Sequence, residues 1–109
     1  MQTVTQEAEL LSAVKGKKAV VHVHATWCPF CRRFKPAFDQ AAAQVKGWDG
    51  LECIIDDESN PIWEHYRIQA VPTVLFFEDG KVTRRLDARL GIGLTEKDLK
   101  TALKNAAAL

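Results

Sequence analysis

The sequence predicts an α/β domain whose central mixed β-sheet is flanked by helices on both faces, with elements in the order βαβαβαββα. Two observations support this prediction. Short apolar runs rich in β-branched residues alternate with amphipathic segments, and Asp79-Gly80 near the end indicates a two-residue hairpin. The 109 residues, of which 47% are hydrophobic, suit a single domain over residues 1–109.

The first half of the chain is predicted to contribute two strands and two helices. Residues 3–5 form a short edge strand, and residues 6–15 form a helix with one apolar side. The valine-rich run 19–25 is typical of a central strand. Residues 29–46 carry apolar side chains at three- and four-residue steps, which predicts a long amphipathic helix that Pro36 should kink.

The second half opens with a predicted strand over residues 51–55. A short helix over residues 61–66 follows, where a proline is tolerated in the first turn. Strands over residues 73–78 and 81–86 flank the hairpin turn, so we expect them to pair antiparallel.

The last predicted helix covers residues 95–108. Thr95 and Asp98 have capping-box spacing at its start, and apolar residues recur along one stripe. Strands separated by helices are expected to pair in parallel, and the hairpin adds an antiparallel piece, so the sheet is mixed.

Composition narrows the classes of function. The net charge of +1 argues against nucleic-acid and membrane-surface partners, and no apolar run approaches the ~20 residues that cross a bilayer. The first residues lack the charged and apolar segments of a secretory signal, so we expect a cytoplasmic location. Three cysteines do not suit a structural disulfide framework, and we interpret them as one redox pair plus Cys53, a small apolar core residue.

The segment Cys28-Pro29-Phe30-Cys31 joins a predicted strand to a predicted helix. Two cysteines at this spacing close a small ring, so their oxidation costs little chain entropy. At the start of a helix, the sulfur of Cys28 meets the positive end of the helix dipole, which favours the reactive thiolate. The sequence therefore predicts a dithiol that exchanges electrons with other disulfides.

With its neighbours, this segment resembles the thioredoxin family. The matching residues are Ala25-Thr26-Trp27-Cys28 with Cys31, Pro36 five residues after the second cysteine, Val71-Pro72-Thr73 entering a strand, and Asp79-Gly80. The resemblance covers nearly the whole chain and implies the thioredoxin fold.

The resemblance also implies a role for each matching position. Cys28 would attack a substrate disulfide, and Cys31, deeper in the helix, would resolve the mixed disulfide. Pro72 matches the family's cis-proline, whose bond presents the backbone of Val71 to an extended substrate peptide. Trp27 would cover one side of the site.

We expect an apolar rim around the cysteines, because apolar residues gathered beside a nucleophile predict a peptide-docking surface. Its members are Trp27, Pro29, Phe30, Val71 and Pro72. Ile92 joins them as a substrate contact from the loop 90–94, which is longer than the loop usual in the family.

The chain departs from the family pattern beneath the cysteines. The family has a buried acid six residues before the first cysteine, where it assists proton transfer at the second; here the residue is His22. His24 occupies a position that is usually aromatic, and Glu52 replaces a lysine that pairs with the acid.

Two hypotheses follow from these departures. First, His22 would replace the acid as the proton carrier for Cys31, with Glu52 as its partner, since an imidazole accepts a thiol proton near neutral pH. The alternative is that His22 is a core histidine with a satisfied hydrogen bond. Second, the altered dipeptide Pro29-Phe30 and the two histidines would make the protein more oxidising than a typical thioredoxin, because an imidazolium near Cys28 would stabilise the thiolate. The potentials of such proteins span about 150 mV.

The sequence thus predicts a thiol–disulfide oxidoreductase of the thioredoxin-like protein disulfide reductase kind, using a reversible Cys28–Cys31 disulfide. Three alternatives stay open: a glutathione-dependent reductase, since Pro29-Phe30 resembles the glutaredoxin dipeptide; a more oxidising oxidase or isomerase; and a metal-binding or interaction module. We expect no cofactor and no bound metal. Electrons would come from a reductase protein or from glutathione.

Overall fold

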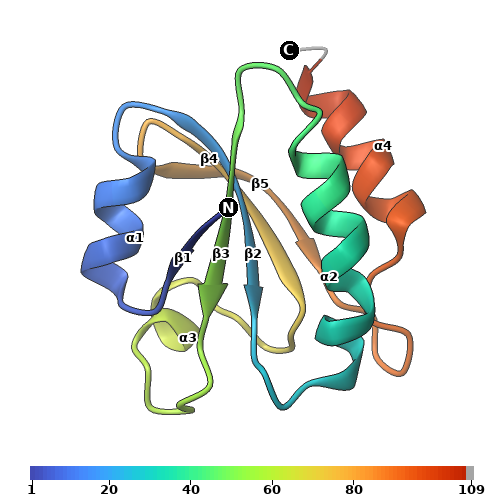
Figure 1. Cartoon of the computed structure of the whole chain (residues 1–109). Helices are drawn as coiled ribbons and strands as arrows, with labels where there is room; N and C mark the ends of the chain where they lie inside the picture. The colour runs from blue at the N-terminus through green and yellow to red at the C-terminus, as the bar shows by residue number, and fades with distance from the viewer. Residues whose placement is uncertain (108–109) are drawn as a thin grey trace.

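Five strands form one mixed sheet in the computed structural model, which describes residues 1–107 (Figure 1). The strands are β1 (Gln2–Val4), β2 (Lys18–His24), β3 (Asp49–Ile54), β4 (Thr73–Glu78) and β5 (Lys81–Asp87). The helices are α1 (Glu7–Val14), α2 (Pro29–Ala42), α3 (Ile62–His65) and α4 (Glu96–Ala107). The sheet order is β1-β3-β2-β4-β5, with β1, β3 and β2 parallel and the β4–β5 hairpin antiparallel. This confirms the predicted mixed sheet and the order of elements.

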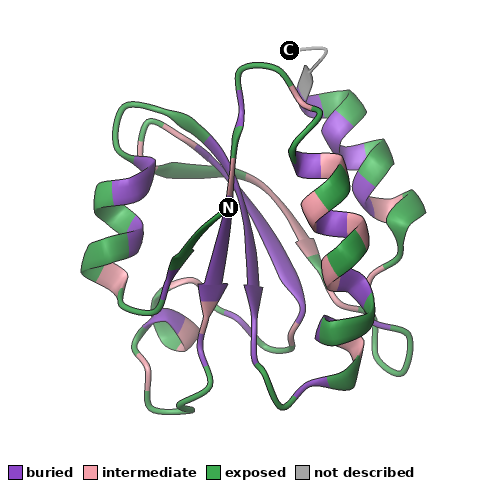
Figure 2. Cartoon of the chain, in the orientation of Figure 1, coloured by how far each residue is buried: buried purple, intermediate pink, exposed green. Residues whose placement is uncertain are grey.

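Helices cover both faces of the sheet, with α1 and α3 on one face and α2 and α4 on the other (Figure 1). Side chains of β2 alternate between the two cores: Val21 packs with Leu10 of α1, and Val20 packs with Phe38 of α2 and Leu99 of α4. The central strands are therefore buried along most of their length (Figure 2). Within the described part of the chain, no helix is both long and apolar enough to cross a membrane.

The element boundaries agree with the predicted ones to within two residues, except at the end of α2. This helix ends at Ala42 rather than at residue 46. The N–H groups of Gln44 and Val45 bond to carbonyls three residues back, and Gly47 follows with a φ of +83°, so tighter turns replace the helix while the apolar spacing continues. Pro36 lies inside α2, and the kink expected there stays a prediction. The predicted end of the last helix, residue 108, lies outside the described residues.

Two local sequence signals are confirmed in the backbone. Asp79 and Gly80 have φ values of +51° and +81°, as a type I′ hairpin turn requires of both central residues. At the start of α4, the Asp98 N–H donates to Thr95 Oγ1 and the Thr95 N–H donates to Asp98 Oδ2, each at 3.1 Å. This reciprocal cap fixes where the last helix begins.

We expect Phe76→Ala to lower the free energy of unfolding by about 3–5 kcal/mol, because it leaves a cavity between the sheet and the α2–α4 layer. Phe76 is fully buried in β4, and its ring lies edge-on to that of Trp48 with centroids 5.7 Å apart. Urea unfolding measures the change. Val82→Ala in β5 is the control: Val82 is 37% exposed, so its loss should stay below about 1 kcal/mol. Equal losses in the two variants would contradict this packing.

Candidate active site

The turn that leads from β2 into α2 is held by Asp56, which follows β3. Its carboxylate accepts hydrogen bonds from the N–H and the hydroxyl of Thr26, both at 2.6 Å. Its backbone carbonyl accepts one from the indole N–H of Trp27 at 3.1 Å. The bonds from the Thr26 hydroxyl and N–H lower the pKa of Asp56. The sequence did not single out this residue, yet it fastens the segment before the cysteines to the neighbouring strand.

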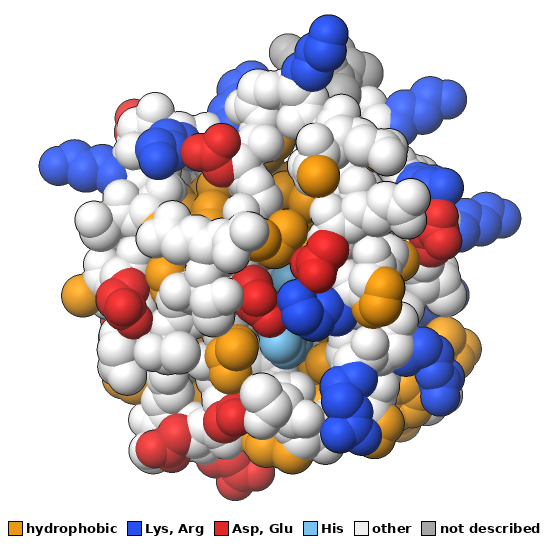
Figure 3. All heavy atoms as spheres, in the orientation of Figure 1, with side chains coloured by type: hydrophobic (Ala, Val, Ile, Leu, Met, Phe, Trp, Pro, Cys, Tyr) orange, Lys and Arg blue, Asp and Glu red, His pale blue; other side chains and the backbone are white. Residues whose placement is uncertain are grey.

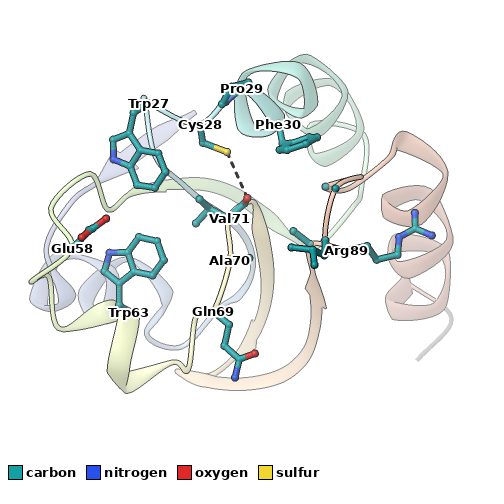
Figure 4. Close-up of a pocket in the computed structure, with 14 residues that line it drawn as sticks. Trp27, Cys28, Pro29, Phe30, Glu58, Trp63, Gln69, Ala70, Val71 and Arg89 are labelled. Atoms are coloured by element: carbon teal, nitrogen blue, oxygen red, sulfur yellow. Dashed lines mark hydrogen bonds between the residues drawn. The ribbon is translucent and has the colours of Figure 1, made fainter.

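Cys28 caps the N-terminus of α2, and Cys31 lies one turn further into the helix. The backbone N–H of Cys31 donates to the sulfur of Cys28 at 3.2 Å, and the Cys28 thiol donates to the carbonyl of Val71 at 3.5 Å (Figure 4). Cys28 is 4% exposed, whereas Cys31 is fully buried. Because an N–H aimed at a sulfur favours the thiolate, this geometry suits Cys28 to the role of attacking thiol.

The other two thiols are held in their protonated form. Burial raises the pKa of Cys31 to about 12, and its hydrogen bond with Cys28 acts in the same direction. Cys31 must therefore lose a proton before it can attack a disulfide, since the thiolate is the nucleophile. Burial also raises the pKa of Cys53 to about 12, and this residue packs in the core on the α1 face.

A cavity of about 460 Å³ opens beside Cys28 (Figure 4). Four members of the predicted apolar rim line it: Trp27, Pro29, Phe30 and Val71.

The other two predicted contacts lie elsewhere. Pro72 is buried and is not among the described residues that line this cavity, although the Val71–Pro72 bond is cis, as the resemblance implies. Ile92, which is 54% exposed, lines a separate hollow beside Arg33 and Phe34 of α2. Ile92 therefore does not line the cavity beside Cys28, and its contact with substrate stays a prediction.

The rest of the cavity wall includes Trp63, which was not predicted from the sequence to lie at the site. Trp63 of α3 lies on the same side as Trp27, fixed by its indole N–H, which bonds to the carbonyls of Ile55 and Asp57 at 3.2 Å (Figure 4). The remaining wall comes from residues before β4 and from the loop after β5. These residues are Glu58, Gln69, Ala70, Ala88, Arg89, Leu90, Gly91 and Gly93.

The loop after β5 is tied to the last helix. The Arg89 side chain points toward α4, where Nη2 donates to Asp98 Oδ2 at 2.8 Å (Figure 4). Leu90 at the tip of the loop is fully exposed. The rim of the cavity therefore ends in an exposed apolar side chain.

His22 and His24 lie on the α2 face of β2 with their rings stacked, 4.3 Å between centroids. His22 is fully buried against Phe34 and Phe38, and neither of its ring nitrogens has a hydrogen-bond partner among the described residues. The hydrogen bond expected of a core histidine is thus not made there. Burial lowers the pKa of His22 to about 2, and the charges of His24 and Lys35 act in the same direction. His22 is therefore neutral at physiological pH.

Glu52 pairs with His24 rather than with His22. Its Oε1 lies 2.7 Å from Nε2 of His24 and 3.4 Å from Nζ of Lys35, while its Oε2 accepts from the hydroxyl of Thr3 at 3.0 Å. This corrects the predicted His22–Glu52 pair: the two residues are opposite each other in the sheet, but the carboxylate reaches the next histidine. Burial raises the pKa of Glu52, but the bonds with His24 and Thr3 and the charge of Lys35 outweigh it, so the pKa is lowered.

A paired dithiol at the start of a helix, beside an apolar cavity, defines the chemistry of a thiol–disulfide oxidoreductase. Within residues 1–107, no cluster of three or more histidine, cysteine, aspartate or glutamate side chains is arranged to hold a metal ion.

Comparison with known proteins agrees with this chemistry. Residues 2–105 match the family model described as Thioredoxin, and the chain belongs to the thioredoxin family. A thioredoxin from Mycoplasmoides gallisepticum is 36% identical over 105 residues, which are 95% of this chain and 100% of that protein. A thioredoxin from Chlamydia trachomatis is 29% identical over 98 residues, covering 90% and 89% of the two chains. The structure of Fasciola hepatica thioredoxin superposes with a TM-score of 0.80 at 26% identity, covering 96% of this chain and 98% of that chain. The protein is a thiol–disulfide oxidoreductase.

Gly93→Ala should destabilise the protein more than Gly91→Ala. Both glycines have left-handed backbones, with φ of +76° and +75°, so each alanine adds about 1–2 kcal/mol of strain. Only at position 93 would the new Cβ lie 3.0 Å from Cβ of Phe30, which should add about 1–3 kcal/mol. Urea unfolding of the two variants measures the difference. Equal losses would show that Phe30 is not held against this loop.

Proposed function

We propose that the protein is a protein disulfide reductase of the thioredoxin kind, and that Cys28 and Cys31 carry its reaction. One observation supports this most strongly: the sulfur of Cys28 is held at the helix start by the Cys31 N–H, next to an apolar cavity of about 460 Å³. The attacking sulfur and a surface for an apolar peptide therefore occur together.

The reaction has two steps. The thiolate of Cys28 attacks one sulfur of the substrate disulfide, whose S–S bond breaks, and the other substrate sulfur leaves as a thiolate that takes up a proton. Cys31, deprotonated, then attacks the sulfur of Cys28. The mixed disulfide breaks, the second substrate thiol leaves, and two electrons have passed from the dithiol to the substrate. A protein reductase would restore the dithiol.

The substrate would bind as an extended peptide across the apolar rim. Trp27, Pro29 and Phe30 would contact its side chains. The carbonyl of Val71 accepts from the Cys28 thiol in the free protein, and this acceptor becomes available to a substrate N–H once the sulfur enters a mixed disulfide. Pro72 would shape the groove through its neighbour Val71. We place this reaction in the cytoplasm, where thiols are kept reduced.

The more oxidising alternative has less support. It depends on Pro29-Phe30 and on an imidazolium near Cys28. Of the two histidines, His22 is held neutral, because burial lowers its pKa to about 2. The glutathione-dependent alternative depends on Pro29-Phe30 alone, and these residues belong to the apolar rim that suits a peptide.

Cys28→Ser should reduce the rate of disulfide reduction at least about a hundredfold, because it removes the nucleophile. Cys31→Ser should instead trap the mixed disulfide, which intact-mass spectrometry detects as protein plus one substrate chain. Cys53→Ser is the control: this thiol is fully buried on the other face of the sheet, so the rate should not change. Reduction that survives Cys28→Ser would remove the basis of the proposal.

The reduction potential of the Cys28–Cys31 pair should be about −270 mV, as in thioredoxins, rather than about −120 mV, as in strong oxidants. Equilibration of the purified protein in glutathione redox buffers measures it. Recycling should require a protein reductase. A potential above about −200 mV, or full recycling by glutathione alone, would favour the oxidising or the glutathione-dependent alternative instead.

A further inference from the structure

Cys31 is one of the residues that line a second cavity, of about 210 Å³, separate from the one beside Cys28. Three ionisable side chains share its lining with Cys31: His24, Glu52 and Lys35. The rest of the lining is Ala25, Thr26, Arg32 and Ile54. Because a water molecule occupies about 30 Å³ in the liquid, this space admits water among the polar side chains that line it together with Cys31. The cavity therefore offers the buried thiol a route for its proton.

The His24–Glu52 contact fixes which ring nitrogen is available. The pKa of Glu52 is lowered, so its side chain is a carboxylate and can only accept. Nε2 of His24, 2.7 Å away, must therefore carry the hydrogen of this bond, which leaves Nδ1 of the neutral ring as the basic nitrogen. A carboxylate in this position also stabilises the ring once it gains a second proton.

Other charged and titratable groups of the neighbouring elements lie near His24. Some of them favour a positive charge on its ring and others oppose it. Lys35, itself paired with Asp39 at 2.8 Å, opposes a positive ring, whereas Glu52 and Asp56 favour one. Among residues 1–107, these groups are Glu52 of β3, Asp56 after β3, Cys31, Arg32 and Lys35 of α2, and His22 of β2.

We propose that His24 accepts the proton of Cys31 through this cavity and that Glu52 is the positioning residue that orients the imidazole, an inference that rests on the proposed disulfide exchange. The step is balanced as follows. The S–H bond of Cys31 breaks and its proton passes, through water, to Nδ1 of His24. The Cys31 sulfur then bonds to the sulfur of Cys28, and the substrate thiolate leaves with the electron pair of the broken S–S bond. His24 returns the proton to solvent.

Access to solvent supports His24 over His22 in this role. His24 is 5% exposed, and histidine atoms are visible at the surface between acidic and basic side chains in Figure 3. His22 is fully buried between aromatic rings, and a proton on it would find no acceptor among the described residues. His22 is thus assigned as a neutral spacer that packs β2 against α2, in place of the proton-carrying role expected for it.

The test uses the full chain, reduced, with the aromatic disulfide dithio-bis-nitrobenzoate in stopped flow. Attack by Cys28 releases one coloured thiol, and attack by Cys31 on the resulting mixed disulfide releases a second, so the two steps appear as separate phases. His24→Gln keeps a side chain that can bond to Glu52 but cannot take up a proton. We expect its first phase to stay within about twofold of the parent. Its second phase at pH 7 should slow by about a hundredfold and rise steadily with pH as hydroxide replaces the lost base.

Two further variants isolate the cause. His65→Gln breaks another histidine–glutamate pair, with Glu7 at 2.7 Å on α1, and should leave both phases unchanged. Glu52→Gln should lower the pH at which the second phase levels off, because the protonated imidazole loses its neighbouring carboxylate; a merely structural role would not move this profile. Glu52→Gln also tests the proposal if His24→Gln fails to fold, which thermal unfolding would reveal.

The outcomes separate the two proposals. If the parent releases no coloured thiol, or only one as Cys31→Ser should, the disulfide exchange itself is wrong. If the parent releases two but His24→Gln keeps the parent's second phase at every pH, the exchange stands and the role of His24 is overturned. A slow second phase in His22→Phe alone would return the proton-carrying role to His22.

Discussion

The placement of β2 at the centre of the sheet is the constraint on which the site depends. This strand pairs with β3 on one side and β4 on the other and is buried on both faces, so it has no freedom to shift. Its last residue, His24, lies three residues before Trp27, and the bonds of Asp56 to Thr26 and Trp27 hold the turn that follows. This arrangement fixes the position of Cys28. The carbonyl of Val71, two residues before β4, accepts a hydrogen bond from its thiol.

Local sequence signals explain why the fold could be predicted. They also explain why the end of α2 could not. The period-two and helical patterns and the Asp79-Gly80 turn act over a few residues, so they are visible in the sequence. The end of α2 at Ala42 was missed because Val45 continues the apolar spacing and packs on the same core from a turn. Periodicity reports which side chains are buried, and a turn can bury them as well as a helix can.

The site also has parts that the sequence predicts and parts that it does not. The position of Cys28 and Cys31 at a helix start follows from adjacent residues, whereas Trp63 and Arg89 reach the cavity from segments that only the folded chain brings near. A tryptophan in a short helix is equally typical of a core residue, so nothing in the sequence marked Trp63. Glu52 is opposite His22 in the sheet, but its side chain is long enough to reach His24, and strand register does not determine that choice.

The hydrogen bonds of Asp98 join the start of α4 to the wall of the cavity beside Cys28. Its carboxylate accepts from the Thr95 N–H, which caps α4, and from Arg89 in the wall of the cavity beside Cys28. Helix ends fray at lower free energy than the sheet unfolds, and units that share hydrogen bonds open together. The same carboxylate therefore connects the first turn of α4 to the wall of the cavity, and fraying of this helix end would also release the hydrogen bond that holds Arg89.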